Sequence, residues 1–138
     1  MSGIIGGAGS KSGVIGTTEL DYEEGNWTPT NSNTLTGGPN GTYVKIGKLV
    51  LCSFYLLANA SSATTGDFGG LPYTSNSAPT NDGAGAGGGT VTYTNNDSVN
   101  YSIRVNSNTK TFRFYQGYIH KQLSANKNAW GTFTYYTS

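Results

Sequence analysis

Charged residues and the most reactive side chains are scarce in this chain of 138 residues. Only 11% of the residues are charged, and the formal net charge is +1 at pH 7. So small a charge excludes binding to nucleic acid or to an anionic membrane through bulk electrostatics. Cys52 is the single cysteine and His120 the single histidine. The chain can therefore form no internal disulfide and no metal site that needs several histidines.

Long hydrophobic runs are also missing. No stretch reaches the roughly 18 apolar residues that a transmembrane helix needs. The N-terminus lacks the basic segment and continuous apolar run of a secretory signal. We therefore expect no membrane association and no export by a standard signal.

The residues that are abundant favour strands over helices. Gly, Ser, Thr and Asn make up about half of the chain. Glycine costs a helix about 1 kcal/mol relative to alanine, while Ser, Thr and Asn divert backbone hydrogen bonds. Ten Tyr, five Phe and two Trp, together with many Thr, are typical of strands. We predict an all-β protein with one core, folded as an antiparallel sandwich or jelly roll with an extended N-terminal arm.

Hydropathy patterns place the individual strands. Residues 99–105 alternate between apolar odd positions and polar even positions, which predicts a strand with one buried face. Residues 49–57 are apolar at almost every position, so we expect a central strand with both faces covered. Residues 81–89 contain five glycines and are too poor in side chains to pack. They are expected to form a surface loop or a bulged edge.

The first 24 residues differ in kind from the rest of the chain. The tetrapeptide Gly3-Ile4-Ile5-Gly6 returns ten residues later as Gly13-Val14-Ile15-Gly16, and no helix or strand period runs through the segment. We interpret residues 1–24 as an anchoring arm and residues 25–138 as a β-sandwich domain. In this interpretation the pairs Ile4, Ile5 and Val14, Ile15 bind grooves on another chain. The alternative is a flexible leader without a role.

Three short sequence motifs carry a resemblance to known proteins. Residues 25–30 read GNWTPT, residues 41–50 read GTYVKIGKLV, and residues 70–75 read GLPYTS. In order and spacing they resemble a module of tailed-phage virion proteins. That module has a Glu-Gly-x-Trp-Thr-Pro motif, followed by Tyr-x-Lys-x-Gly-x-x-Val and then by Gly-Leu-Pro-Phe/Tyr-x-Ser. The module is found at the C-terminus of phage tail fibres and in small virion proteins, including capsid decoration proteins. The resemblance covers residues 13–75; the later residues match only in general character, and the glycine stretch before Thr90 departs from the pattern.

Few residues could support catalysis. A Cys52 and His120 pair has no context that would activate the thiol. A glycosidase needs two carboxylates facing each other, and the carboxylates here are few and lie in the arm or in predicted loops. The glycine-rich stretch before Thr90 lies outside any βαβ unit, so it is no dinucleotide-binding loop. We expect no enzyme activity, no cofactor and no metal, with a depolymerase as the least favoured function.

Tyrosine density points instead to binding. Adjacent tyrosines such as Tyr135 and Tyr136 must point to opposite faces of a strand, so one of each pair lies outside the core. Exposed tyrosines suit either a subunit interface or a sugar-binding surface, and we favour the interface. Because proteins resembling this one are commonly threefold, a homotrimer is expected. The candidate interface residues are Tyr115, Tyr118, Tyr135 and Tyr136.

The resemblance and the binding surface together give the functional hypothesis. We expect a non-enzymatic virion structural protein, assembled in the host cytoplasm and located in the phage particle. A capsid decoration or cement protein, attached through its arm to the major capsid protein or another virion protein, is favoured. The alternative is a short tail fibre or receptor-binding tip that recognises host-surface glycan.

Overall fold

The computed structural model describes residues 21–33, 35–38, 40–77, 84–96 and 100–138, and these ranges contain strands and turns but no helix. The strands are β1 (Tyr22–Trp27), β2 (Thr30–Asn31), β3 (Asn40–Ile46), β4 (Leu49–Leu57), β5 (Phe68–Gly69), β6 (Ala84–Thr94), β7 (Ser102–Asn106), β8 (Phe112–Gln116), β9 (Ile119–Lys121) and β10 (Asn128–Tyr136). The predicted all-β, antiparallel class is confirmed.

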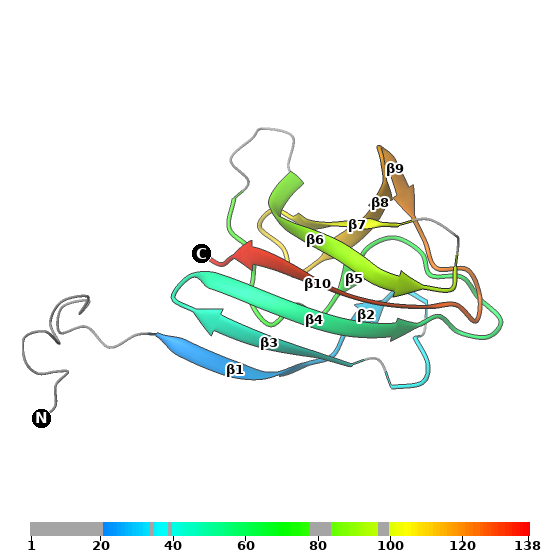
Figure 1. The fold of residues 1–138 in the computed structure, drawn as a ribbon, viewed down its shortest axis with the longest axis horizontal. Helices are drawn as coiled ribbons and strands as arrows, with labels where there is room; N and C mark the ends of the chain where they lie inside the picture. Colours follow the sequence, from blue (N-terminus) through cyan, green and yellow to red (C-terminus); the bar gives the residue numbers. More distant parts are fainter. Residues whose placement is uncertain (1–20, 34, 39, 78–83, 97–99) are drawn as a thin grey trace, which may run out of the picture.

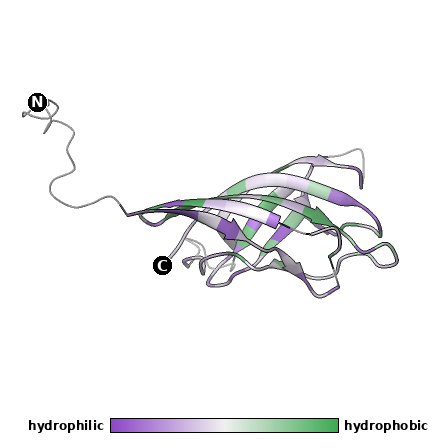
Figure 2. Ribbon diagram, turned by 90° about the horizontal axis from the view of Figure 1, so that it is seen from below, coloured by the Kyte–Doolittle hydropathy of each residue, from purple (hydrophilic) through white to green (hydrophobic). Residues whose placement is uncertain are grey.

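All strands belong to one hydrogen-bonded sheet. Their order is β1-β3-β4-β10-β6-β7-β8-β5-β2, with β9 paired to β8. The sheet curls into a half-barrel, so that β4 and β10 face the returning strands β8 and β5 (Figure 1). Along the strands, bands of hydrophobic and hydrophilic residues follow one another (Figure 2), as expected when one face of each strand is buried.

Aromatic rings fill the inside of the curl. The ring of Phe112 in β8 lies 6.1 Å from Trp27 in β1, 5.6 Å from Phe54 in β4 and 5.0 Å from Phe133 in β10, measured between ring centroids. These contacts join strands that are far apart in the sheet order. The core therefore holds the two halves of one sheet together, as a sandwich core joins two sheets.

The glycine-rich stretch is part of the sheet interior. Residues 84–94 form β6, which pairs with β10 on one side and with β7 on the other. The expectation of a surface loop or bulged edge for residues 81–89 was therefore wrong for residues 84–89, although a register shift does occur between Ala84 and Gly87. A Cβ on Gly89 would overlap the backbone of Phe133. The absence of side chains is what allows β6 to lie this close to β10.

The boundary between arm and domain also differs from the prediction. Tyr22, Glu23 and Glu24 already pair with β3, opposite Ile46, Lys45 and Val44 respectively. The sheet therefore begins three residues before the expected start at residue 25, and a boundary placed after residue 24 falls inside β1. The rest of the predicted arm, with Ile4, Ile5, Val14 and Ile15, lies outside the described residues.

Candidate binding surface

The outer face of the sheet exposes a continuous group of large apolar side chains. Cross-strand pairing aligns Tyr22 of β1 with Ile46 of β3, Ile46 with Leu49 of β4, and Leu49 with Tyr136 of β10. In the next row Leu51 pairs with Val44. We call these six residues the outer-face patch, which comprises Tyr22, Val44, Ile46, Leu49, Leu51 and Tyr136. All except Val44 are exposed to solvent, and Leu51 is 48% exposed.

Alternation along β4 produces this patch. Val50, Cys52, Phe54 and Leu56 point into the curl and are buried, so the residues between them point outward. The prediction that both faces of this strand are covered was wrong for the described chain: its inner face is covered by the core, and Leu49 and Leu51 face outward. An apolar strand with one open face is typical of a surface that another molecule covers.

A second group of aromatic residues, two exposed and one half-buried, lies at the other end of the same face. Trp130 of β10 pairs with Tyr55 of β4 and with Tyr93 of β6. The rings of Tyr93 and Trp130 stack with centroids 4.2 Å apart and an interplanar angle of 17°, and Tyr55 is 6.0 Å from Trp130 on the other side. We call Tyr55, Trp130 and Tyr93 the aromatic ladder. Tyr93 and Trp130 stack on each other, whereas the ring of Tyr55 is tilted by 39° against that of Trp130.

Polar side chains separate the patch from the ladder. In the row between them, Thr42 of β3 lies opposite Ser53 of β4, and Ser53 lies opposite Thr132 of β10. The hydroxyl oxygens of Thr42 and Ser53 are 2.6 Å apart and share a hydrogen bond. The outer face thus carries two distinct apolar surfaces with a polar boundary.

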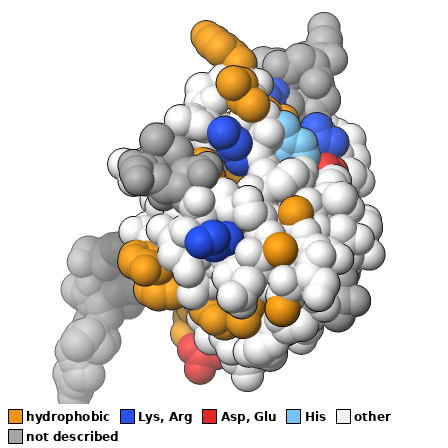
Figure 3. Space-filling model, turned by 90° about the vertical axis from the view of Figure 1, so that its right-hand side faces the viewer, with side chains coloured by type: hydrophobic (Ala, Val, Ile, Leu, Met, Phe, Trp, Pro, Cys, Tyr) orange, Lys and Arg blue, Asp and Glu red, His pale blue; other side chains and the backbone are white. Residues whose placement is uncertain are grey.

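The turn between β8 and β9 carries exposed apolar residues at the other end of the sheet order. Gly117 adopts a positive φ of 59°, and the next residue, Tyr118, is fully exposed. Ile119 follows at 64% exposure. We call Tyr118 and Ile119 the β8–β9 tip. Hydrophobic side chains project from this side of the molecule, which also carries the histidine and basic side chains (Figure 3).

A polar cluster surrounds the strands behind this tip. The guanidinium of Arg113 donates to both carboxylate oxygens of Asp67, at 2.5 and 3.2 Å, and Asn106 donates to the same carboxylate at 2.7 Å. Arg104 lies opposite Arg113, and its guanidinium lies over the ring of Tyr115 at 5.5 Å. Burial, with a smaller contribution from the charge of Arg113, lowers the pKa of His120 from its ordinary value.

Of the four tyrosines predicted for a subunit interface, the structure leaves three at the surface. Tyr136 belongs to the outer-face patch, Tyr118 to the β8–β9 tip, and Tyr115 is half-buried beside Arg104. Tyr135 was wrongly included, because it is 1% exposed and lies in the core. The expected opposition of Tyr135 and Tyr136 is confirmed, but the sequence could not tell which of the two faced inward.

The three sequence motifs lie together in the fold. Residues 25–27 of the first motif pair with residues 41–43 of the second across β1 and β3. The Tyr43 hydroxyl donates to the Glu23 carboxylate at 2.6 Å, and the rings of Tyr43 and Tyr73 meet edge to face at 5.7 Å. Hydrogen bonds from Tyr43 and Tyr73 lower the pKa of Glu23 and hold its carboxylate ionised. Ser75 is buried, and its hydroxyl donates to the carbonyl of Asn106. These contacts tie β1, β3 and the 70–75 segment together, which is a structural role.

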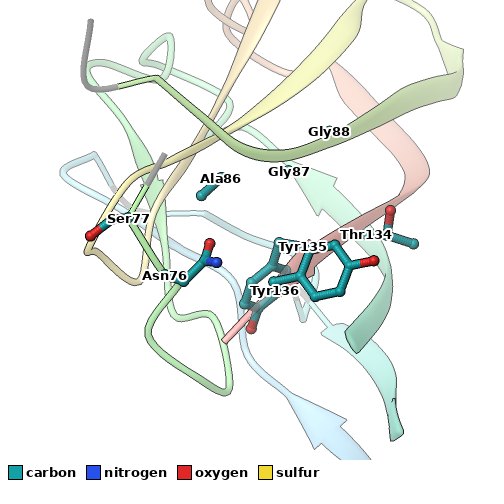
Figure 4. A pocket seen from close by; sticks show the side chains of 8 residues that line it. All are labelled: Asn76, Ser77, Ala86, Gly87, Gly88, Thr134, Tyr135 and Tyr136. Carbon is teal, nitrogen blue, oxygen red and sulfur yellow. The ribbon is translucent and has the colours of Figure 1, made fainter. Parts of the chain in front are cut away.

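The described residues offer little for catalysis. They contain no group of three His, Cys, Asp or Glu side chains that could hold a metal ion. Burial raises the pKa of the Cys52 thiol to about 12, so the thiol is neutral at pH 7 and inert. A pocket of about 390 Å³ lies between the start of β6, the end of β10 and residues 76–77 (Figure 4), but its side chains are small, neutral or tyrosine. No helix in the described ranges is long and apolar enough to cross a membrane.

No protein-family model, curated protein or solved structure matches the chain.

Proposed function

We propose that this chain is a non-enzymatic structural protein of a phage particle, a capsid decoration or cement protein that assembles as a homotrimer and attaches through its N-terminal arm. The observation that carries the proposal is the outer-face patch, which exposes five large apolar side chains on one face of a small domain. Such a surface on a protein of this size favours association with other protein chains over chemistry. The resemblance of the three sequence motifs to phage virion proteins is the reason for placing the protein in a phage particle.

The place where the arm joins the sheet supports attachment at this end of the molecule. The carbonyl of Asp21 accepts a hydrogen bond from Gly47 at 2.7 Å, and the carboxylate of Asp21 lies 2.5 Å from the ammonium of Lys45. Residue 21 is therefore fixed to the β3–β4 hairpin, directly before Tyr22 of the patch. The pairs Ile4, Ile5 and Val14, Ile15 precede this fixed point and are proposed to bind a major capsid protein or another virion protein.

The experiment is to find the protein in purified particles and to remove the arm. Immunoelectron microscopy is expected to show many copies over the capsid. A variant lacking residues 2–18 should keep the folded domain, because β1 begins at Tyr22, but should be lost from particles. A matched variant with Ile4, Ile5, Val14 and Ile15 changed to serine keeps the length of the arm and should be lost as well. Normal incorporation of both variants would overturn attachment through the arm.

The alternative is a short tail fibre or receptor-binding tip that recognises host-surface glycan. The aromatic ladder favours it, because exposed tyrosine and tryptophan rings can stack on a sugar ring. Against it, Trp130 already stacks on Tyr93 and has Tyr55 on its other side, which leaves less free ring face. Location of the protein at the tail, together with loss of glycan binding in a Trp130→Ala variant, would favour this alternative over the capsid.

A further inference from the structure

Two exposed apolar features of this chain are unexplained by its own fold. The outer-face patch lies on β1, β3, β4 and β10, and the β8–β9 tip projects Tyr118 and Ile119 into solvent. Tight turns normally carry polar residues and glycine, so a fully exposed tyrosine followed by an exposed isoleucine is unusual. Both features cost solubility in an isolated monomer.

The two features cannot meet within one chain. In the sheet order β4 and β8 are separated by β10, β6 and β7, and the curl turns the outer faces of the two halves away from each other. In Figure 1, β9 lies at the opposite end of the molecule from the start of β1. A contact between tip and patch therefore requires two copies.

A hollow beside the patch has a lining that suits the tyrosine of the tip. Residues of β1 and β3 line a depression of about 460 Å³, formed by Glu24, Gly25, Asn26, Thr42, Tyr43 and Val44. It adjoins the patch at Val44 and has apolar and hydrogen-bonding groups together. That combination suits a tyrosine, whose ring is apolar and whose hydroxyl needs a partner. Asn26 and Thr42 offer such partners.

Charges of opposite sign lie at the two features. Glu24 lines the hollow and lies on the same face as the patch, opposite Val44. Behind the tip, Arg104, Arg113 and Lys121 outnumber Asp67. Complementary charges steer the two surfaces together and disfavour contact between two patches or between two tips.

We propose that the β8–β9 tip of one copy docks on the outer-face patch of the next copy, with Tyr118 entering the hollow between β1 and β3. The contact is heterologous, because two different surfaces meet. In the homotrimer the contact repeats around a threefold axis, so that each copy uses its tip and its patch at once. The inference deepens the homotrimer of the proposed function, on which it rests, by naming its contact surfaces.

Single-cysteine variants test this contact directly. Ile119→Cys places a thiol on the tip and Leu51→Cys places one on the patch, while the native Cys52 is buried and unreactive. With a short bismaleimide, each variant alone should give no covalent dimer. An equal mixture of the two should give dimers that contain one copy of each variant. Dimers from Leu51→Cys alone would show patch against patch, dimers from Ile119→Cys alone would show tip against tip, and either result would overturn the proposal.

Serine variants measured by light scattering give an independent test. Tyr118→Ser with Ile119→Ser removes the tip, and Leu49→Ser with Leu51→Ser removes the patch. Each should shift the protein from trimer to monomer at micromolar concentration, and Tyr93→Ser, which removes an exposed aromatic residue elsewhere on the sheet, should leave the trimer intact. All variants should keep the wild-type circular dichroism spectrum.

The outcomes separate this inference from the proposed function. A trimer that survives loss of the tip and gives no mixed cross-link overturns the docking of tip on patch, while the role in the particle stands. A protein absent from particles, in which tip and patch nevertheless cross-link, overturns the proposed function and leaves the contact intact. A wild-type protein that stays monomeric without any cross-link overturns the contact.

Discussion

The indole ring of Trp27 occupies the space that a side chain on Gly41 would need. The two residues pair across β1 and β3, and the indole nitrogen donates to the carbonyls of Thr42 at 3.2 Å and Ser53 at 3.1 Å. A Cβ on Gly41 would overlap that nitrogen. One glycine thus allows a buried tryptophan to cross β3 and reach β4.

Gly41→Ala should therefore destabilise the domain by displacing this ring. We expect a loss of about 1 to 3 kcal/mol in the free energy of unfolding, the usual cost of overpacking. Urea denaturation followed by tryptophan fluorescence measures it. Thr132→Ala on the exposed side of β10 is the control and should change stability by less than about 0.5 kcal/mol. Equal stability of the two variants would contradict the close contact.

Substitution of two leucines in β4, one buried and one exposed, should differ sharply in its effect on the free energy of unfolding. Leu56 is fully buried, so Leu56→Ala should cost about 2 to 5 kcal/mol. Leu51 is exposed in the single chain, and Leu51→Ala should cost less than about 1 kcal/mol. The measurement is chemical denaturation at a concentration low enough to hold the protein monomeric. Similar losses in both variants would show that the outer face is covered within one chain.

The hydroxyl of Tyr135 should contribute to stability although tyrosine was expected at the surface here. It donates to the carbonyl of Tyr73 at 3.0 Å and accepts from the amide of the same residue at 3.2 Å. Tyr135→Phe removes both bonds and leaves buried backbone groups unpaired, which costs about 1 to 3 kcal/mol. Tyr136→Phe on the exposed side should be neutral. Thermal denaturation of the two variants compares them directly.

The same hydroxyl gives a signature at alkaline pH. Burial raises the pKa of Tyr135 above its ordinary value of 10, so above pH 10 the unfolded chain loses this proton before the folded chain does. The contribution of Tyr135 to stability is complete below pH 10 and falls as the pH rises further. The difference in unfolding free energy between wild type and Tyr135→Phe should therefore narrow above pH 10. A constant difference would contradict a buried, neutral hydroxyl.

Cys52 should resist modification in the folded protein. Its pKa of about 12 and its burial leave almost no accessible thiolate at pH 8. Alkylation by iodoacetamide, followed by mass spectrometry, should be at least about 100-fold slower in the native state than in urea. Labelling at equal rates would show that β4 opens readily.

Local patterns in the sequence were sufficient for the all-β class and for several of the strands. Alternation in residues 99–105 predicted the buried side of β7, where Ile103 and Val105 point inward. This feature follows from the period of two in strands, which needs no knowledge of distant residues.

The candidate surface was only partly predictable, because it depends on residues that are distant in the sequence. A sequence shows that Tyr135 and Tyr136 point in opposite directions, but the core side is set by which strands lie opposite. Likewise, the glycines of β6 were expected to form a loop or edge. Their role is to let β10 come close, and β10 is distant in the sequence. The apolar run at residues 49–57 correctly indicated a central strand, but its uncovered face became visible only with the sheet assembled.

Composition and periodicity by themselves determined that this chain is all-β and antiparallel with one core, because backbone propensity and side-chain alternation act between near neighbours. Only the tertiary structure decided that Ile46, Leu49, Leu51 and Tyr136 form one surface with Tyr22, and that the β8–β9 tip lies at the far end of the molecule from it. Those relations depend on strand order and register, which long-range pairing fixes. They are also the relations on which assembly depends.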